Sequence, residues 1–238
     1  MSSRSEKGHA KNVANFETEI LFCTAYGTAY NPSNSLLTIE SLNTQLSLSR
    51  TSLAEVITIK NQLDLIKNER QAAFMPLKRT ATRIINALEA TDISKQTIEK
   101  AKSINKKIQG QRSNTKPNEE KKRISTSQQS YDSLVENFSK LIDLISSEIR
   151  YTPNETELKI TTLDEYTRNL CAISTNVIIA NTMYSNVLIS RDNILYAVDT
   201  GLVDTALSVK KYVKSLFGTT SPQYKQISKL EFTRPTKA

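Results

Sequence analysis

The sequence predicts an all-α protein: an elongated helical bundle built from two tandem repeats of three to four helices each, with long amphipathic central helices. Three observations support this prediction. Apolar residues recur at the alternating three- and four-residue spacing of packed helices over about five heptads. No segment alternates for long with the period of two that is typical of a strand. The two halves of the 238-residue chain also resemble each other.

A Tyr-x-Pro motif occurs twice, with the same apolar pattern behind it. At an offset of 121 residues the matching positions are Tyr30/Tyr151, Pro32/Pro153, Leu37/Leu158, Ile39/Ile160, Leu42/Leu163 and Arg70/Arg191. Further along, residues 87–88 match residues 215–216 at an offset of 128, which indicates a seven-residue insertion near residues 200–206. Seven residues are two helical turns, so the apolar face stays aligned. The alternative is a chance likeness between two apolar-periodic segments.

We therefore expect five segments along the chain. They are a disordered head at 1–10, a helical repeat at 11–110, a polar basic linker at 111–126, a second helical repeat at 127–232 and a tail at 233–238. Proline disfavours helix in the residue before it, so the Tyr-x-Pro motif ends the first helix of each repeat. Pro76 and Gly201 follow the long helices, and each predicts either a kink or a reversal.

The composition argues against enzyme chemistry. One histidine, His9, and two cysteines cannot build a His/Cys zinc site, and the five glycines form no phosphate-binding motif. Neither a GxSxG elbow nor the Glu-x-x-His motif of di-iron bundles is present. We predict no catalytic residue, no cofactor and no metal, and hence a protein that is not an enzyme.

Cys23 and Cys171 lie inside apolar stripes on separate segments. They predict two reduced, buried thiols in a cytoplasmic protein, with a disulfide between them as the alternative. The N-terminus lacks the apolar core of a secretory signal. Residues 169–190 carry no charge and are long enough to span a bilayer, but polar side chains recur on one side of that helix. We therefore do not expect a membrane span.

Positive charge concentrates in the C-terminal part of each repeat. Residues 91–125 carry ten basic and four acidic groups, and residues 206–238 carry seven basic and one acidic group. Such clusters attract nucleic acid or another polyanion, although a solvated helix face carries similar charge. Lysine dominates and residues 95–123 contain no aromatic side chain, which favours non-specific binding. The candidate residues are Lys95, Lys100, Lys102, Lys106, Lys107, Lys121, Lys122, Arg123, Lys210, Lys211, Lys214, Lys225 and Lys229.

Arg70 and Arg191 fall at a heptad core position in both repeats. An unpaired buried charge is unfavourable, so each guanidinium needs a carboxylate or carbonyl partner. One interpretation is a polar layer that fixes helix register, and the other is an anion or ligand site inside the bundle. The candidate partners are acids of the first helix of either repeat, namely Glu17, Glu19 and Glu136.

Four segments carry a likeness to other proteins. They are Tyr30-Asn31-Pro32-Ser33-Asn34, Asn68-Glu69-Arg70-Gln71-Ala72-Ala73-Phe74, Tyr196 with Thr200-Gly201-Leu202-Val203-Asp204, and Ser215-Leu216-Phe217-Gly218 with Ser221-Pro222-Gln223-Tyr224-Lys225. Over residues 15–232 the chain resembles a group of uncharacterised, duplicated α-helical proteins of Bacteroidetes-type bacteria. The resemblance implies a duplicated bacterial helical protein and brings no activity, substrate or catalytic residue with it.

Sustained heptads without assembled chemistry favour a non-catalytic scaffold or interaction protein that binds a protein partner or a second copy of itself. The second hypothesis is a basic bundle that binds nucleic acid or another polyanion non-specifically. The third is a membrane-active helical protein that uses residues 169–190.

Overall fold

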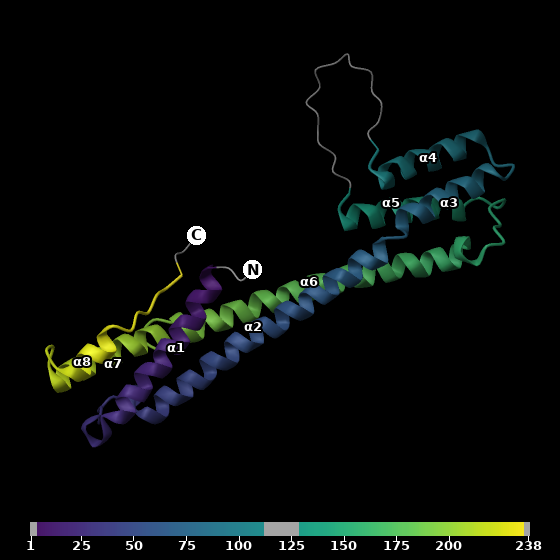
Figure 1. Ribbon diagram of the computed structural model, residues 1–238. Coiled ribbons are helices and arrows are strands. Elements are labelled where there is room, and N and C mark those ends of the chain that lie inside the picture. The colour runs from purple at the N-terminus through teal and green to yellow at the C-terminus, as the bar shows by residue number, and fades with distance from the viewer. Residues whose placement is uncertain (1–3, 112–128, 236–238) are drawn as a thin grey trace, which may run out of the picture. The chain divides into compact units, whose positions relative to one another are not determined.

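A computed structural model describes the backbone of residues 4–111 and 129–235, and the side chains of these residues from Gly8 onward (Figure 1). Within these residues the regular structure is all helical and contains no strand, which confirms the prediction of an all-α protein. The α-helices are α1 (Arg4–Ala25), α2 (Ile39–Phe74), α3 (Leu77–Glu89), α4 (Lys95–Gln109), α5 (Tyr131–Ser146), α6 (Ile160–Tyr196), α7 (Leu202–Phe217) and α8 (Pro222–Ser228). Short 3-10 turns are η1 (Gly27–Ala29), η2 (Ser35–Leu37) and η3 (Thr156–Leu158).

The chain forms two compact units that do not coincide with the two expected repeats. Unit 1 holds the described residues up to Gln62 together with those from Asn181 onward, and unit 2 holds Leu63–Ala180. Helix α2 therefore begins in unit 1 and ends in unit 2, whereas α6 begins in unit 2 and ends in unit 1. The predicted linker at 111–126 lies, apart from Gln111, outside the described residues.

Helix α1 is packed into the core of unit 1. This helix packs against α7 and α8, and η2 packs against α7. The buried apolar side chains include Phe16, Ile20, Leu42, Leu202, Ala206, Val209, Val213 and Ile227. Helices from the two ends of the sequence thus share one core.

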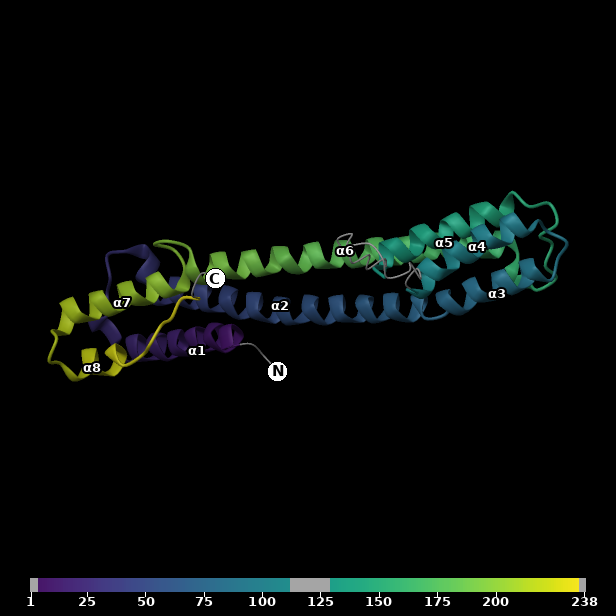
Figure 2. The same cartoon turned by 90° about the horizontal axis from the view of Figure 1, so that it is seen from above.

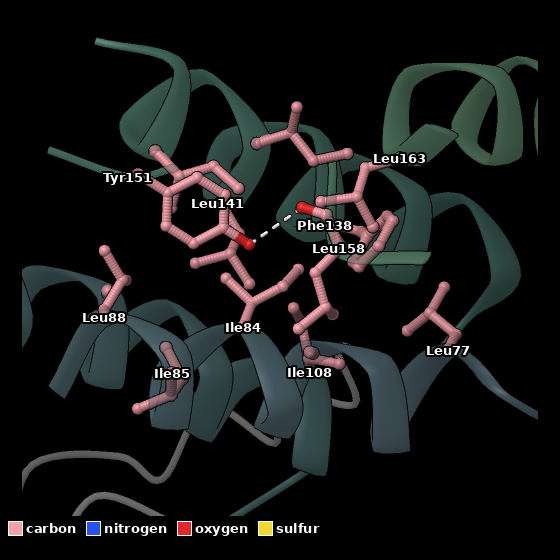
Figure 3. Close-up of a cluster of buried hydrophobic side chains, with 14 of the residues drawn as sticks. Leu77, Ile84, Ile85, Leu88, Ile108, Phe138, Leu141, Tyr151, Leu158 and Leu163 are labelled. Atoms are coloured by element: carbon pink, nitrogen blue, oxygen red, sulfur yellow. Dashed lines mark hydrogen bonds between the residues drawn. The ribbon is translucent and has the colours of Figure 1, made fainter. Parts of the chain in front are cut away.

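Unit 2 closes around α5 in the same manner. Helix α5 packs against α3 and α4, and η3 packs against α3. Figure 3 shows part of this core, which includes Leu77, Ile84, Leu88, Phe138, Leu141, Leu158 and Leu163. Unit 2 therefore combines its helices in the same way as unit 1.

The two Tyr-x-Pro motifs make the same hydrogen bond. The Tyr30 hydroxyl donates to the carbonyl oxygen of Leu37 at 2.8 Å, and the Tyr151 hydroxyl donates to that of Leu158 at 3.0 Å. Both rings are buried, and the second bond is visible in Figure 3. A buried phenol that satisfies a buried carbonyl fixes the turn between the first helix and the long helix in each half of the chain.

The long helices bury a narrow heptad seam. On α2 the buried seam includes Leu42, Val56 and Leu63, and on α6 it includes Leu163, Leu170 and Val177. Residues of the other faces, such as Ile57 and Ile178, are exposed. The alternating spacing read from the sequence therefore corresponds to the buried side of each helix.

Pro76 and Gly201 mark kinks rather than reversals. Figures 1 and 2 show α3 continuing in the direction of the end of α2, and α7 continuing in the direction of the end of α6. The connection is short at Pro76 and five residues long (197–201) before α7. The buried faces of α3 and α7 match at an offset of 125, as in Leu77/Leu202 and Leu88/Val213. The expected match of 88 with 216 at an offset of 128 does not agree with burial, because Leu88 is fully buried while Leu216 is 39% exposed.

Candidate functional site

Helix α1 carries polar side chains on the side that faces the core. His9, Asn12 and Glu19 are at most 2% exposed, and they share this side with Phe16 and Cys23. The spacing of these five positions is three or four residues, which places them on one helical stripe. The expected disordered head at 1–10 differs from the structure here, because α1 begins at Arg4 and the buried stripe extends back to His9.

Glu19 is the most unusual member of this stripe. The residue is 0% exposed, and neither carboxylate oxygen has a hydrogen-bond partner among the described residues. Burial raises the pKa of Glu19 well above its usual range, and the nearby charge of Lys210 opposes this increase. Removing a carboxylate from water disfavours its ionised form, so burial favours the protonated form of Glu19.

Three further titratable groups surround Glu19. Burial raises the pKa of Cys23 to about 12 and that of Tyr26 to about 12, and it raises the pKa of Tyr30 further. These three groups therefore stay uncharged at neutral pH.

Lys210 of α7 is the cation whose charge lowers the pKa of Glu19. It also contacts residues 230 and 232 near the C-terminus. Its ammonium group donates to the carbonyl oxygen of Leu230 and lies 5.1 Å from the ring centroid of Phe232. Burial lowers the pKa of Lys210, while Glu19 and Glu231 oppose this decrease. Lys210 thus contacts the C-terminal segment directly and interacts electrostatically with the buried acid.

The segment at 230–235, here called the C-terminal strap, is extended and lies against α1. The buried Asn12 amide binds Thr233 twice: Nδ2 donates to its carbonyl oxygen at 2.7 Å, and Oδ1 accepts from its N–H at 3.0 Å. Asn15 donates to the carbonyl oxygen of Glu231 at 2.7 Å. These bonds recognise main-chain groups, so they hold the strap independently of most of its side chains.

Arg234 provides a charged anchor for the strap. Its guanidinium lies 2.6 Å from an Asp204 carboxylate oxygen and donates to the carbonyl oxygen of Tyr196 at 2.8 Å. The bond from Arg234 lowers the pKa of Asp204. Tyr196 also lies 2.5 Å, through its hydroxyl, from Nδ1 of His9. Residues 233 and 234 of the expected tail at 233–238 are therefore held against unit 1 by these bonds.

The structure places Arg70 and Arg191 in different units. Arg191 is 5% exposed and binds Asp192 Oδ1 through Nε at 2.9 Å and Nη2 at 2.8 Å. The Arg70 guanidinium lies 4.0 Å from the ring centroid of Tyr131, and its buried Nε has no hydrogen-bond partner among the described residues. A guanidinium stacks well on an aromatic face, which partly compensates its desolvation.

None of the three acids expected to pair with these arginines forms an ion pair with them in the described residues. Glu17 binds Arg50 of α2 at 2.5 Å, and Glu136 binds Lys140 at 2.5 Å. Glu19 is the unpaired acid described above. Glu19 thus belongs to the site for a different reason from the one inferred from sequence.

Both cysteines are free, but only Cys23 is buried. The expectation that Cys171 is buried is wrong, because this residue lies on the outer side of α6. It borders two shallow grooves of unit 2 with volumes of about 410 Å³ and 340 Å³. The second groove is lined by α5 and α6 and includes Ser174, whose buried hydroxyl oxygen has no partner among the described residues.

Most of the candidate lysines in the described residues are exposed, and two of them bind groups of the protein. On α4, Lys95, Lys100, Lys106 and Lys107 are exposed, while Lys102 binds Glu89 at 2.6 Å. In unit 1, Lys211, Lys214, Lys225 and Lys229 are exposed and Lys210 contacts the strap. Lys121, Lys122 and Arg123 lie outside the described residues.

The described residues show neither a metal-binding cluster nor a membrane-spanning helix. No group of three or more His, Cys, Asp or Glu side chains there is placed to hold a metal ion. No described helix, α6 included, combines the length and the apolar character needed to cross a bilayer.

Comparisons with known proteins give no match: no family model, no curated protein and no solved structure matches this chain.

Proposed function

We propose that this chain is a non-catalytic helical interaction protein built from two copies of one helical unit. The first copy supplies α1–α4 and the second supplies α5–α8. The paired bonds of Tyr30 and Tyr151 support this proposal, as do the contacts of α1 with α7 and α8, which correspond to those of α5 with α3 and α4. Each compact unit then combines the first helix of one copy with the last two helices of the other.

One observation supports an interaction role: α6 exposes large apolar side chains. Ile178 is 62% exposed and Ile189 is 58% exposed, and Ile179 and Met183 are also exposed. Residues 169–190 carry no charge, so two such helices can approach each other without like-charge repulsion. Exposed apolar side chains that gather on one helix are typical of an interaction surface. A second copy of this chain is the partner that we propose.

The test is the molar mass of the full chain across a concentration series, measured by light scattering or sedimentation. We expect association that rises with concentration, and its loss in the variant Ile178→Glu/Ile189→Glu. Ile149→Glu is the matched control, because Ile149 is 93% exposed but lies outside α6. A wild-type chain that stays monomeric up to about millimolar concentration contradicts self-association.

A second candidate function is non-specific polyanion binding, and the exposed lysines of α4 favour it. Five lysines and one acid occupy this helix, and Lys106 and Lys107 lie in its last turn. Cations in that position also stabilise the helix dipole, which is a structural role for the same charges.

Binding of a DNA duplex or heparin over a salt series tests the second candidate. Reversal of Lys100, Lys106 and Lys107 to Glu should weaken binding and reduce the salt slope by about one per lost phosphate contact. Reversal of Arg79, Lys159 and Arg168, which are exposed and lie outside α4, is the matched control. Absence of binding at low salt dismisses this function.

A further inference from the structure

Unit 1 contains a buried acid that its fold does not require. The position of Glu19 follows Phe16 by three residues, and the equivalent position after Phe138 in unit 2 is Leu141, which is fully buried and apolar. An apolar residue therefore serves the packing of the first helix at this place. A carboxylic acid whose two oxygens are unpaired in a core is an unfavourable choice for packing alone, and it indicates a role that uses its titration.

Among the charged and titratable groups near Glu19, Lys210 is the cation that interacts with it electrostatically. On α1 itself Cys23 and Tyr26 are uncharged at neutral pH, and so is Tyr30 in the connection to α2. From α2, Arg50 is bound to Glu17, two residues away and on the opposite side of α1. From α7, Lys210 acts directly on Glu19, and Glu231 of the strap acts on Lys210.

Lys210 has two alternative partners. In the structure it binds the Leu230 carbonyl and the Phe232 ring, both in the C-terminal strap. The ionised form of Glu19 would leave a charge buried without a partner, which is the arrangement that proteins avoid most strongly. The flexible four-carbon stem of a lysine allows its ammonium group to turn from one partner to the other.

We propose that Glu19 and Lys210 form a proton-controlled latch on the C-terminal strap. When Glu19 carries its proton, Lys210 holds Leu230 and Phe232 against unit 1. When Glu19 releases its proton to solvent, Lys210 turns to pair with the carboxylate, and the first anchor of the strap is lost. The Asn12 and Arg234 anchors remain, so the strap loosens from residue 230 onward before it separates. This inference does not depend on the proposed function.

Hydrogen exchange of the strap amides in the full chain, corrected for the intrinsic pH dependence of exchange, tests the latch between about pH 5 and pH 9. The Leu230 amide is the main reporter, because it donates to the Ile227 carbonyl oxygen directly beside the anchor that Lys210 forms. We expect its protection to fall about tenfold as pH rises, the factor that corresponds to one lost charge-assisted hydrogen bond. Lys210→Met should show low protection at every pH.

Two variants of Glu19 make the test decisive. Glu19→Gln and Glu19→Leu should both keep the strap protected at high pH, and the leucine variant copies the residue that unit 2 uses at this position. Wild-type protection that does not change with pH overturns the latch. A pH dependence that persists in both variants overturns it as well. Buried amides of α7 serve as the control for general opening of unit 1.

Discussion

Helix α1 of unit 1 and helix α5 of unit 2 occupy corresponding places with different chemistry. Phe16 and Phe138 are both fully buried, but the next position on the stripe is Glu19 in one helix and Leu141 in the other. At the same offset, the buried Asn12 of α1 corresponds to Leu134 of α5. Leu141 and Leu134 show that the packing needs no polar group at these two positions. The polar residues of α1 therefore serve the strap and the latch rather than the core.

The largest expected effect comes from copying the acid into unit 2. Leu141→Glu places a carboxyl group in a core that has no cation equivalent to Lys210, so we expect unit 2 to lose about 3–5 kcal/mol of unfolding free energy. Urea unfolding, followed by hydrogen exchange of unit 2 amides, measures the loss. Ile149→Glu is the control at an exposed site. A loss below about 1 kcal/mol would show that unit 2 tolerates the acid and would remove the contrast.

The connection before α7 is the second difference between the units. A Cβ added at Gly201 would lie 2.5 Å from the backbone nitrogen of Ala197 and 2.7 Å from its carbonyl oxygen. Gly201→Ala must therefore shift the backbone, and we expect a loss of about 2–3 kcal/mol in thermal or urea unfolding. Gly27 has a positive φ but open space around it, so Gly27→Ala should lose only about 1 kcal/mol. Equal losses would contradict this account of the turn.

Glu19→Leu converts the core of unit 1 to the chemistry of unit 2. Because the folded chain holds the Glu19 proton more tightly than the unfolded chain, whose glutamates titrate near about 4.3, the stability of unit 1 is highest at acidic pH. It falls as pH rises from that value through the raised pKa of the buried acid. The variant should gain about 1–3 kcal/mol at about pH 8 and lose this pH dependence.

Glu17→Gln is the matched control for this variant. Glu17 is partly exposed and bound to Arg50, so its replacement should change stability by less than about 1 kcal/mol. Urea unfolding at several pH values gives both results. A leucine variant that is less stable than the wild type at neutral pH would show that Glu19 stabilises the core.

The smallest expected effect concerns the tyrosine hydrogen bond that occurs in both halves of the chain. Tyr30→Phe and Tyr151→Phe each remove the donor to a buried carbonyl oxygen, that of Leu37 or Leu158. We expect losses of about 1–2 kcal/mol that agree with each other within about 0.5 kcal/mol. A marked loss at one tyrosine alone would argue against the duplication.

Sequence periodicity predicted the helices and their buried sides. The heptads of α2 and α6 placed Leu42, Val56, Leu163 and Val177 on the buried seam, and the Tyr-x-Pro pattern located the turn in each half. Periodicity succeeds here because a helix that buries one side repeats its apolar residues every three or four positions. The same pattern placed Cys171 in the core, where it is not, because the exposed side of α6 also contains apolar residues.

Periodicity could not predict which helices form each unit, nor the site around Glu19. Nothing local in the sequence says whether α1 packs against α3 and α4 or against α7 and α8, since both pairs present equivalent apolar faces. A signal for Glu19 existed, because an acid interrupts the stripe from Phe16 to Cys23. The heptad pattern alone predicts a different role for this acid, as a partner of Arg70 or Arg191. The strap carries no periodicity, so its bonds to Asn12 and Asn15 required the structure.

The most direct test of the contrast between the two units is the titration of the Glu19 side chain itself. The carboxyl carbon of Glu19, assigned by comparison of wild type with Glu19→Gln, can be followed by carbon NMR as a function of pH. The account predicts a midpoint well above the usual glutamate value of about 4.3. A midpoint at or below that value would mean that Glu19 is solvated or paired, and it would contradict both the buried acid and the latch built on it.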